Sequence, residues 1–144
     1  AEECAAELKM PLKKVHKGAY GEEKAKLLAE ASAVLMPTLY LEPFGYVAIE
    51  AQMCGTPVIT TDWGAFAETV KQGINGYRCR TLAEFKKAVK LSEKLNRKKI
   101  RELAIKHYTL DAVAHSYESY FKFVWNIHKY GGYYANDAFR AEFY

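Results

Sequence analysis

The sequence has no apolar run that approaches the length of a membrane span, and nothing in its first residues predicts a signal peptide. It also has no internal repeat and no low-complexity stretch. Wholesale disorder is excluded by the composition, because half of the residues are apolar and 14% are aromatic. A globular fold is therefore expected, and 144 residues are enough to bury the core of one domain.

A strong excess of one charge is missing as well. The chain has 21 Lys and Arg against 17 Asp and Glu, which gives a net charge of +4. The lysines are mostly scattered along predicted helices instead of clustering in one patch. Nucleic-acid binding domains have a basic stripe or face, so we expect no nucleic-acid partner.

Cysteine is scarce, with only Cys4, Cys54 and Cys79 in the sequence. An odd number does not suit a framework of disulfides, and the spacing is not that of zinc ligands. Thiols that stay reduced are typical of the cytosol. We therefore predict a cytoplasmic location and no metal site.

The sequence over residues 33–55 predicts a strand, a loop and a helix. Residues 33–36 form an apolar run of strand length that a proline ends. Glu42 precedes another proline and so belongs to the loop. Apolar residues then recur at helical spacing from Gly45 until Gly55. The start of such a helix faces the carboxyl edge of the sheet, where its free N–H groups favour a phosphate.

Two glutamates of this unit are candidate ligand-binding residues. Glu42 projects from the loop over the end of the strand, and Glu50 lies about 8 Å along the helix axis. A ligand with phosphates at the helix start could reach both carboxylates. The spacing alone also fits a loop carboxylate and a solvated helix residue, since ionised glutamates are mostly surface groups.

Four short strands alternate with helices along the chain. They lie near Val15, Val34, Val58 and Tyr77. This order predicts an α/β fold with an open, Rossmann-like parallel sheet, helices on both faces and a ligand at the carboxyl edge. A capping box at Thr81 predicts a further helix, whose apolar positions are Phe85, Ala88, Val89 and Leu95.

Two later segments have a clear pattern. The basic run 97–99 is typical of the solvated face of a short helix. Asp111 begins a long amphipathic helix whose apolar residues keep to one side. These residues are Val113, Tyr117, Tyr120, Phe121, Val124 and Ile127. Phe123 and Trp125 are expected elsewhere on the helix, toward another surface.

The motifs resemble those of the retaining glycosyltransferases of the GT-B fold, the glycosyl transferases group 1 or GT4-like family, over roughly residues 12–130. Glu42-Pro43-Phe44-Gly45, with Glu50 eight positions after Glu42, is similar to the Glu-x7-Glu motif of that family. Five further landmarks come in the family's order. They are Gly18-Ala19-Tyr20, the predicted helix 24–31, Gly55-Thr56-Pro57-Val58-Ile59, Gly64-Ala65-Phe66-Ala67-Glu68 and Asn75-Gly76-Tyr77.

The resemblance implies a site for a nucleotide diphosphate sugar. Glu42 would contact the sugar hydroxyls and is the predicted catalytic residue, while Glu50 would bind the ribose hydroxyls. The predicted donor-binding residues are Gly18, Tyr20, Phe44, Gly45, Tyr46, Val47, Glu50 and Gly64. The family does not usually require a metal, so no metal and no cofactor are expected beside the donor substrate.

The resemblance also implies that parts of the family's architecture are missing. Residues 1–130 would be an N-terminally truncated donor-binding domain, in which 109–130 form a long C-terminal helix, and 131–144 an aromatic tail without a pattern. No residue matches the basic pair that grips the diphosphate in the family. Ala65 and Ala67 stand where the family commonly has glycine and proline.

The resemblance predicts the donor half of an enzyme that transfers a hexose to an acceptor. The acceptor domain would be absent, so this stretch alone is expected to be inactive. Two further interactions are possible for such a protein. They are peripheral membrane contact through the acceptor domain and self-association. A nucleotide-sugar epimerase of the same architecture and a non-catalytic nucleotide-binding or interaction module are the alternative functions.

Overall fold

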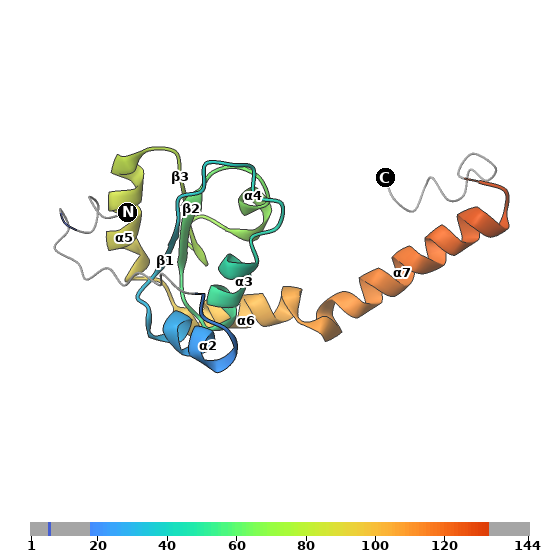
Figure 1. The fold of residues 1–144 in the computed structure, drawn as a ribbon, viewed down its shortest axis with the longest axis horizontal. Helices are drawn as coiled ribbons and strands as arrows, with labels where there is room; N and C mark the ends of the chain where they lie inside the picture. Colours follow the sequence, from blue (N-terminus) through green and yellow to red (C-terminus); the bar gives the residue numbers. More distant parts are fainter. Residues whose placement is uncertain (1–5, 7–17, 133–144) are drawn as a thin grey trace. The chain divides into compact units, whose positions relative to one another are not determined.

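The computed structural model describes Ala6 and residues 18–132 (Figure 1). The elements are α2 (Gly21–Glu30), β1 (Val34–Met36), α3 (Tyr46–Met53), β2 (Val58–Thr61), α4 (Phe66–Thr69), β3 (Gly76–Cys79), α5 (Leu82–Ser92), α6 (Arg97–Tyr108) and α7 (Leu110–Lys129). The chain divides into two compact units, Ala1–Ile105 and Lys106–Tyr144. The strand predicted near Val15 lies outside the described residues.

The described strands form one parallel sheet in the order β1-β2-β3. Leu35 pairs with Ile59, and Ile59 pairs with Tyr77. All residues of β2 are buried because strands flank it on both sides. The sequence predicted β1 as buried too, but its residues are only half-buried. Among the described strands, β1 lies at one end of the sheet and pairs only with β2.

Successive residues of the strands point to opposite faces of the sheet, and each face packs against helices. On one face, Val58 belongs to a core with residues of α2, α3 and α4, which are Leu28, Ala48, Ala51 and Phe66. On the other face, Ile59 packs with residues of α5, which are Phe85, Ala88 and Val89. Figure 1 shows α5 and α3 on opposite sides of the strands. The predicted Rossmann-like sheet with helices on both faces is confirmed.

Helix α5 begins with the predicted capping box. The Glu84 N–H donates to Thr81 Oγ1 over 3.3 Å, and the Thr81 N–H donates to the Glu84 carboxylate. The helix ends at Ser92, so Leu95 does not belong to it, contrary to the prediction. The Leu95 N–H instead donates to the Ser92 carbonyl over 3.1 Å, a turn that takes the chain out of the helix.

A buried asparagine joins three elements beside the sheet. Asn75 is only 5% exposed, and its Nδ2 donates to Gln52 Oε1 over 3.0 Å and to the Thr69 carbonyl over 3.1 Å. Its Oδ1 accepts from the Lys71 N–H over 2.7 Å. Burying a polar group without a hydrogen-bond partner is unfavourable, and here the buried polar groups are partners of one another. The cluster holds α3 and α4 to the turn before β3.

Of the basic run 97–99, Lys98 and Lys99 are exposed as predicted, but Arg97 is half-buried and does not belong to the solvated face. Its guanidinium donates to the carbonyl groups of Ala29 and Ala31 over 2.6 and 2.7 Å, and to Thr56 Oγ1 over 2.7 Å. The last carbonyl groups of a helix have no partner inside the helix. Arg97 supplies donors for the end of α2, a role that no local pattern indicates.

The second unit contains α7, which Thr109 caps by accepting from the Ala112 N–H over 3.3 Å. No residue of α7 is buried. A shallow groove on this helix is lined by Ala114, Tyr117, Glu118, Phe121, Lys122 and Trp125. Trp125 was expected elsewhere on the helix, but it shares this groove with Tyr117 and Phe121. The three residues follow one another at intervals of four and so lie along one side.

None of the described helices has the length and apolarity that crossing a membrane requires. The predicted division of the chain at residue 130 stays a prediction.

Candidate functional site

Two loops at the carboxyl edge of the sheet are joined to each other. The first follows β1 and the second follows β2. At their base, the hydroxyl oxygens of Thr38 and Thr61 are 3.0 Å apart and share a hydrogen bond. Farther along, the Ala65 N–H donates to the Glu42 carbonyl over 2.8 Å. The backbone around Glu42 is therefore held by the second loop.

Gly64 allows this close approach of the two loops. Its φ is +63°, in the left-handed region that favours glycine. A Cβ at this position would lie 2.5 Å from both the backbone nitrogen and the carbonyl oxygen of Glu42. Gly64, a predicted donor-binding residue, thus leaves space for the backbone of Glu42, the candidate catalytic residue.

The Glu42 carboxylate accepts two hydrogen bonds within its own loop. Oε1 accepts from the Gly45 N–H over 3.0 Å, and Oε2 accepts from the Tyr40 hydroxyl over 2.6 Å. The bond to the carboxylate raises the pKa of Tyr40, so this phenol stays a donor. Each carboxylate oxygen has a second lone pair for a further donor.

Sequence reasoning missed Tyr40. A spacing of two residues has no fixed geometry in a loop, so the sequence contains no signal for this contact.

Helix α3 starts beside Glu42 without a side-chain cap. Its N-cap is Gly45, which has a φ of +81°. Among the described residues, no hydrogen-bond partner satisfies the N–H groups of Tyr46 and Val47. No acidic residue lies in the first turn either. These N–H groups and the positive end of the helix dipole are the features that the predicted phosphate site requires, and that site stays a prediction.

The Gly45 N–H differs from its neighbours, because Glu42 already accepts from it. If a phosphate bound at the helix start, this N–H group would have to be shared with the carboxylate. The rings of Phe44 and Tyr46 lie 4.7 Å apart. The Tyr46 and Val47 side chains are exposed, and both come from the first turn of α3.

Glu50 is not a free carboxylate. Its Oε1 is 2.6 Å from Lys24 Nζ, and both side chains are about one third exposed. Its Oε2 is buried and has no hydrogen-bond partner in the part of the chain that the structure describes. Sequence reasoning missed Lys24, since a pair separated by 26 positions forms only when α2 packs against α3.

Gly18 and Tyr20 lie together at the start of α2. A Cβ on Gly18 would be 2.9 Å from the Tyr20 hydroxyl oxygen, so the ring covers the glycine. Tyr20 is the N-cap of α2 and is 80% exposed. No contact between these two residues and Glu42 is recorded among the described residues. Tyr20 nonetheless caps the same helix that carries Lys24, which reaches Glu50.

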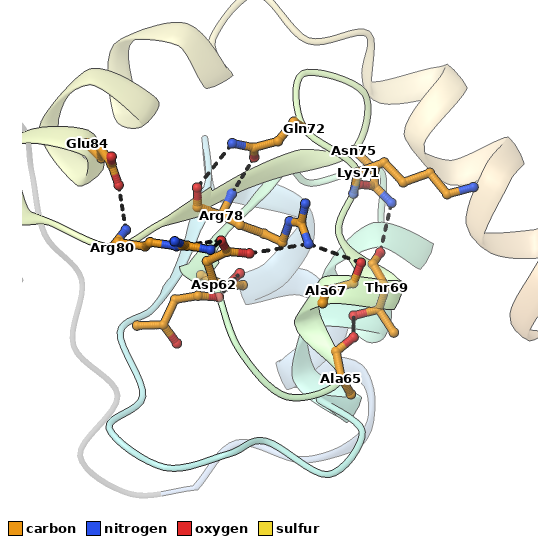
Figure 2. A network of polar contacts seen from close by, with 12 residues as sticks. Asp62, Ala65, Ala67, Thr69, Lys71, Gln72, Asn75, Arg78, Arg80 and Glu84 are labelled. Carbon is orange, nitrogen blue, oxygen red and sulfur yellow. Dashed lines mark hydrogen bonds and ion pairs between the residues drawn. The ribbon is translucent and has the colours of Figure 1, made fainter.

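An ion-pair cluster fixes the loop after β2 (Figure 2). Both guanidinium groups shown there approach the Asp62 carboxylate: Arg78 Nη1 is 3.3 Å from Oδ1, and Arg80 Nη2 is 2.8 Å from Oδ2. Arg78 Nη1 also donates to the Ala67 carbonyl over 3.1 Å. The cluster ties α4 and this loop to β3. No local pattern in the sequence indicates these ion pairs.

The described residues include no group of three or more His, Cys, Asp or Glu that could hold a metal ion. The expectation that the protein needs none stays a prediction.

The pKa of Cys79 is raised to about 11, mainly by burial, so this thiol is neutral and packs in the core.

The chain was compared with known protein families and curated proteins. A family model described as glycosyl transferases group 1 matches residues 2–108. An uncharacterized glycosyltransferase of Methanocaldococcus jannaschii is 43% identical over 56 residues, which are 39% of this chain and 14% of that protein. A glycogen synthase of Mycobacterium tuberculosis is 44% identical over 57 residues, 40% of this chain and 14% of that protein.

A D-inositol 3-phosphate glycosyltransferase of Streptomyces griseus subsp. griseus is 34% identical over a longer stretch of 84 residues, 52% of this chain and 18% of that protein. The chain thus spans less than a fifth of the length of these relatives. The family match itself covers most of the chain. The chain therefore belongs to the glycosyl transferases group 1 family.

Proposed function

We propose that this chain is the nucleotide-sugar-binding part of a retaining glycosyltransferase of the GT4 type. It would take a hexose from a nucleotide diphosphate sugar and pass it to an acceptor. The observation that carries the proposal is the joined pair of loops, which places the Glu42 carboxylate beside the uncapped start of α3. A hydroxyl-binding carboxylate and an anion-binding helix end are the two chemistries that such a donor requires.

The helix start would act on the leaving diphosphate. As the bond between the sugar and the diphosphate breaks, negative charge gathers on the phosphate oxygens. The N–H groups of Tyr46 and Val47 are already oriented by α3, so they can stabilise this charge without reorganisation. Since the positive end of α3 meets the charge, the proposal assigns no metal and no cofactor to the site.

Glu42 would hold the sugar in place. Its two intramolecular bonds leave acceptor capacity on both oxygens, which suits the hydroxyl groups of a hexose. Glycosidases use a pair of carboxylates as acid and base or nucleophile. In our proposal, Glu42 and Glu50 instead serve binding and positioning.

The first test is binding of the nucleotide diphosphate. We expect Glu50→Ala to lower the affinity of the chain for its nucleotide about tenfold or more, because a charged acceptor of the ribose hydroxyls is lost. Calorimetric titration with UDP, GDP and ADP measures this change and identifies the base.

Glu68→Ala is the matched control for this titration. Glu68 is an exposed glutamate of α4, and we expect its loss to leave the affinity unchanged. Thermal unfolding of both variants shows whether removal of the Lys24–Glu50 pair disturbs the fold. Equal and negligible changes in the two variants would show that Glu50 has no part in nucleotide binding.

The assays that follow distinguish the proposed enzyme from its alternatives. Sugar transfer to an acceptor supports the glycosyltransferase. Inversion at a sugar carbon would indicate an epimerase of the same architecture, and nucleotide binding without either product would indicate a non-catalytic module. Inactivity of the 144-residue chain alone belongs to the same proposal, since the acceptor site would lie outside it.

We also propose that the apolar side of α7 contacts the acceptor-binding domain. Phe121 is 63% exposed and lines the groove with Tyr117 and Trp125, so no described residue of the second unit buries this face. Phe121→Ser is expected to leave the melting temperature of this chain unchanged. In a longer protein that includes the acceptor domain, the same change should lower it by several degrees.

Comparing the two melting curves tests this contact. A decrease in the short chain as large as in the long one would place the effect of Phe121 inside α7 itself. A loss of dimers from the short chain by size-exclusion chromatography would favour self-association instead. Membrane contact through the acceptor domain and the cytoplasmic location remain predictions.

A further inference from the structure

The Lys24–Glu50 ion pair joins two helices that both have a predicted donor-binding residue. Helix α2 has Tyr20 at its start, and α3 carries Glu50. Lys24 lies one turn after Tyr20, whose carbonyl accepts from the Lys24 N–H over 3.4 Å. From that position, Lys24 Nζ reaches Glu50 Oε1 at 2.6 Å. One turn of α2 thus connects Tyr20, a predicted donor-binding residue, with Glu50, the candidate ribose contact.

We propose that Lys24 is a positioning residue that sets the recognition of ribose through Glu50. This inference rests on the proposed function and adds to it a residue that determines specificity. Glutamate is a flexible side chain, and its carboxylate binds a diol well only when its orientation is fixed beforehand. The ammonium group of Lys24 fixes one oxygen of Glu50 by a charge-assisted hydrogen bond.

The state of the other oxygen supports a binding role. Glu50 Oε2 is buried and has no partner among the described residues. An unsatisfied buried acceptor is unfavourable, so the pair is not optimised for stability alone. A small movement of Glu50 about the atom that Lys24 holds would bring Oε2 to a ligand hydroxyl.

The alternative is that the pair only holds α2 against α3. The two roles predict different effects on ligand choice. A purely structural pair would, when broken, weaken the binding of every nucleotide by the same factor. A positioning role would weaken ribonucleotides and leave their 2′-deoxy counterparts almost unaffected, since these lack a hydroxyl that Glu50 is proposed to bind.

The experiment is a titration of the full chain with UDP, GDP and ADP and with the 2′-deoxy form of each. The unaltered chain should prefer the ribonucleotide about tenfold. Lys24→Met should reduce this preference to about one, mostly through weaker ribonucleotide binding. Lys24→Arg keeps a charged donor and should restore most of the preference.

Lys26→Met is the matched control. Lys26 lies on the same helix and pairs with Glu30 at 3.9 Å, and both side chains are exposed. We expect this variant to keep the full preference for the ribonucleotide over its 2′-deoxy form. Thermal unfolding of each variant tests whether it is folded.

The outcomes separate this inference from the proposed function. An unchanged preference in Lys24→Met, with nucleotide binding intact, overturns the role of Lys24 alone. Binding of both sugar forms equally by the unaltered chain also overturns it, and leaves the nucleotide site in place. If none of the three nucleotides binds the unaltered chain, the proposed donor site fails and this inference fails with it.

Discussion

Replacing Glu42 with glutamine is expected to lower the rate of sugar transfer by about a hundredfold to a thousandfold, the range seen when one preorganised electrostatic group is removed. Glutamine keeps the size of the side chain but removes its charge. Both oxygens of Glu42 accept hydrogen bonds, from Tyr40 and from Gly45. The amide oxygen can still accept from the Gly45 N–H, but the amide NH2 can only donate, so the Tyr40 hydroxyl would have to change from donor to acceptor.

This loss should appear in catalysis more than in nucleotide affinity. Transfer is measured as nucleotide diphosphate released from the sugar donor in the presence of acceptor, with the acceptor domain included. Calorimetry with the nucleotide diphosphate alone should give nearly the native affinity, because Glu42 is proposed to contact the sugar. Glu68→Gln makes the same chemical change on the exposed side of α4 and should retain the native rate. A transfer rate within twofold of native in Glu42→Gln would remove Glu42 from the catalytic site.

Gly64→Ala is expected to lower the free energy of unfolding by about 3 kcal/mol. Two costs add at this position. A side chain in the left-handed region costs about 1 kcal/mol. The added Cβ would also lie 2.5 Å from the backbone nitrogen and oxygen of Glu42, so the two loops must separate. Denaturant unfolding measures the stability, and the transfer assay should show an additional loss as Glu42 moves.

Gly73→Ala separates the clash from the backbone strain. Gly73 has a similar φ of +71°, but the nearest atom to an added Cβ is the Tyr77 hydroxyl oxygen at 3.8 Å. We expect this variant to lose only about 1 kcal/mol and to keep full activity. Equal losses of stability in the two variants would mean that the contact between Gly64 and Glu42 costs nothing to open.

Local patterns predicted much of the fold because their causes are local. The apolar run and prolines around Glu42 predicted the strand, loop and helix, and the structure has β1 and α3 at these places. The capping box at Thr81 was predicted for the same reason, since both of its partners lie within one turn. The prediction that β1 is buried was wrong, because the burial of a strand depends on which elements flank it.

The contacts around the site could not be predicted, because they join distant segments. Lys24 reaches Glu50 only when two helices pack, and Arg97 reaches the end of α2 from another element. Asp62 meets Arg78 and Arg80 across neighbouring strands. The sequence contains each of these charges without indicating its partner. The functional assignments of Glu42 and Glu50 remain predictions that the experiments above test.

The two loops at the sheet edge have a consequence for protein engineering. The Ala65 N–H donates to the Glu42 carbonyl, and Gly64 leaves space for the Glu42 backbone. The position of Glu42 therefore depends on both loops. Moving residues 37–45 alone into another sheet would transfer the carboxylate without the support that orients it. The smallest part of this site that could be transferred to another protein is therefore the pair of loops together with β1 and β2, the strands that precede them.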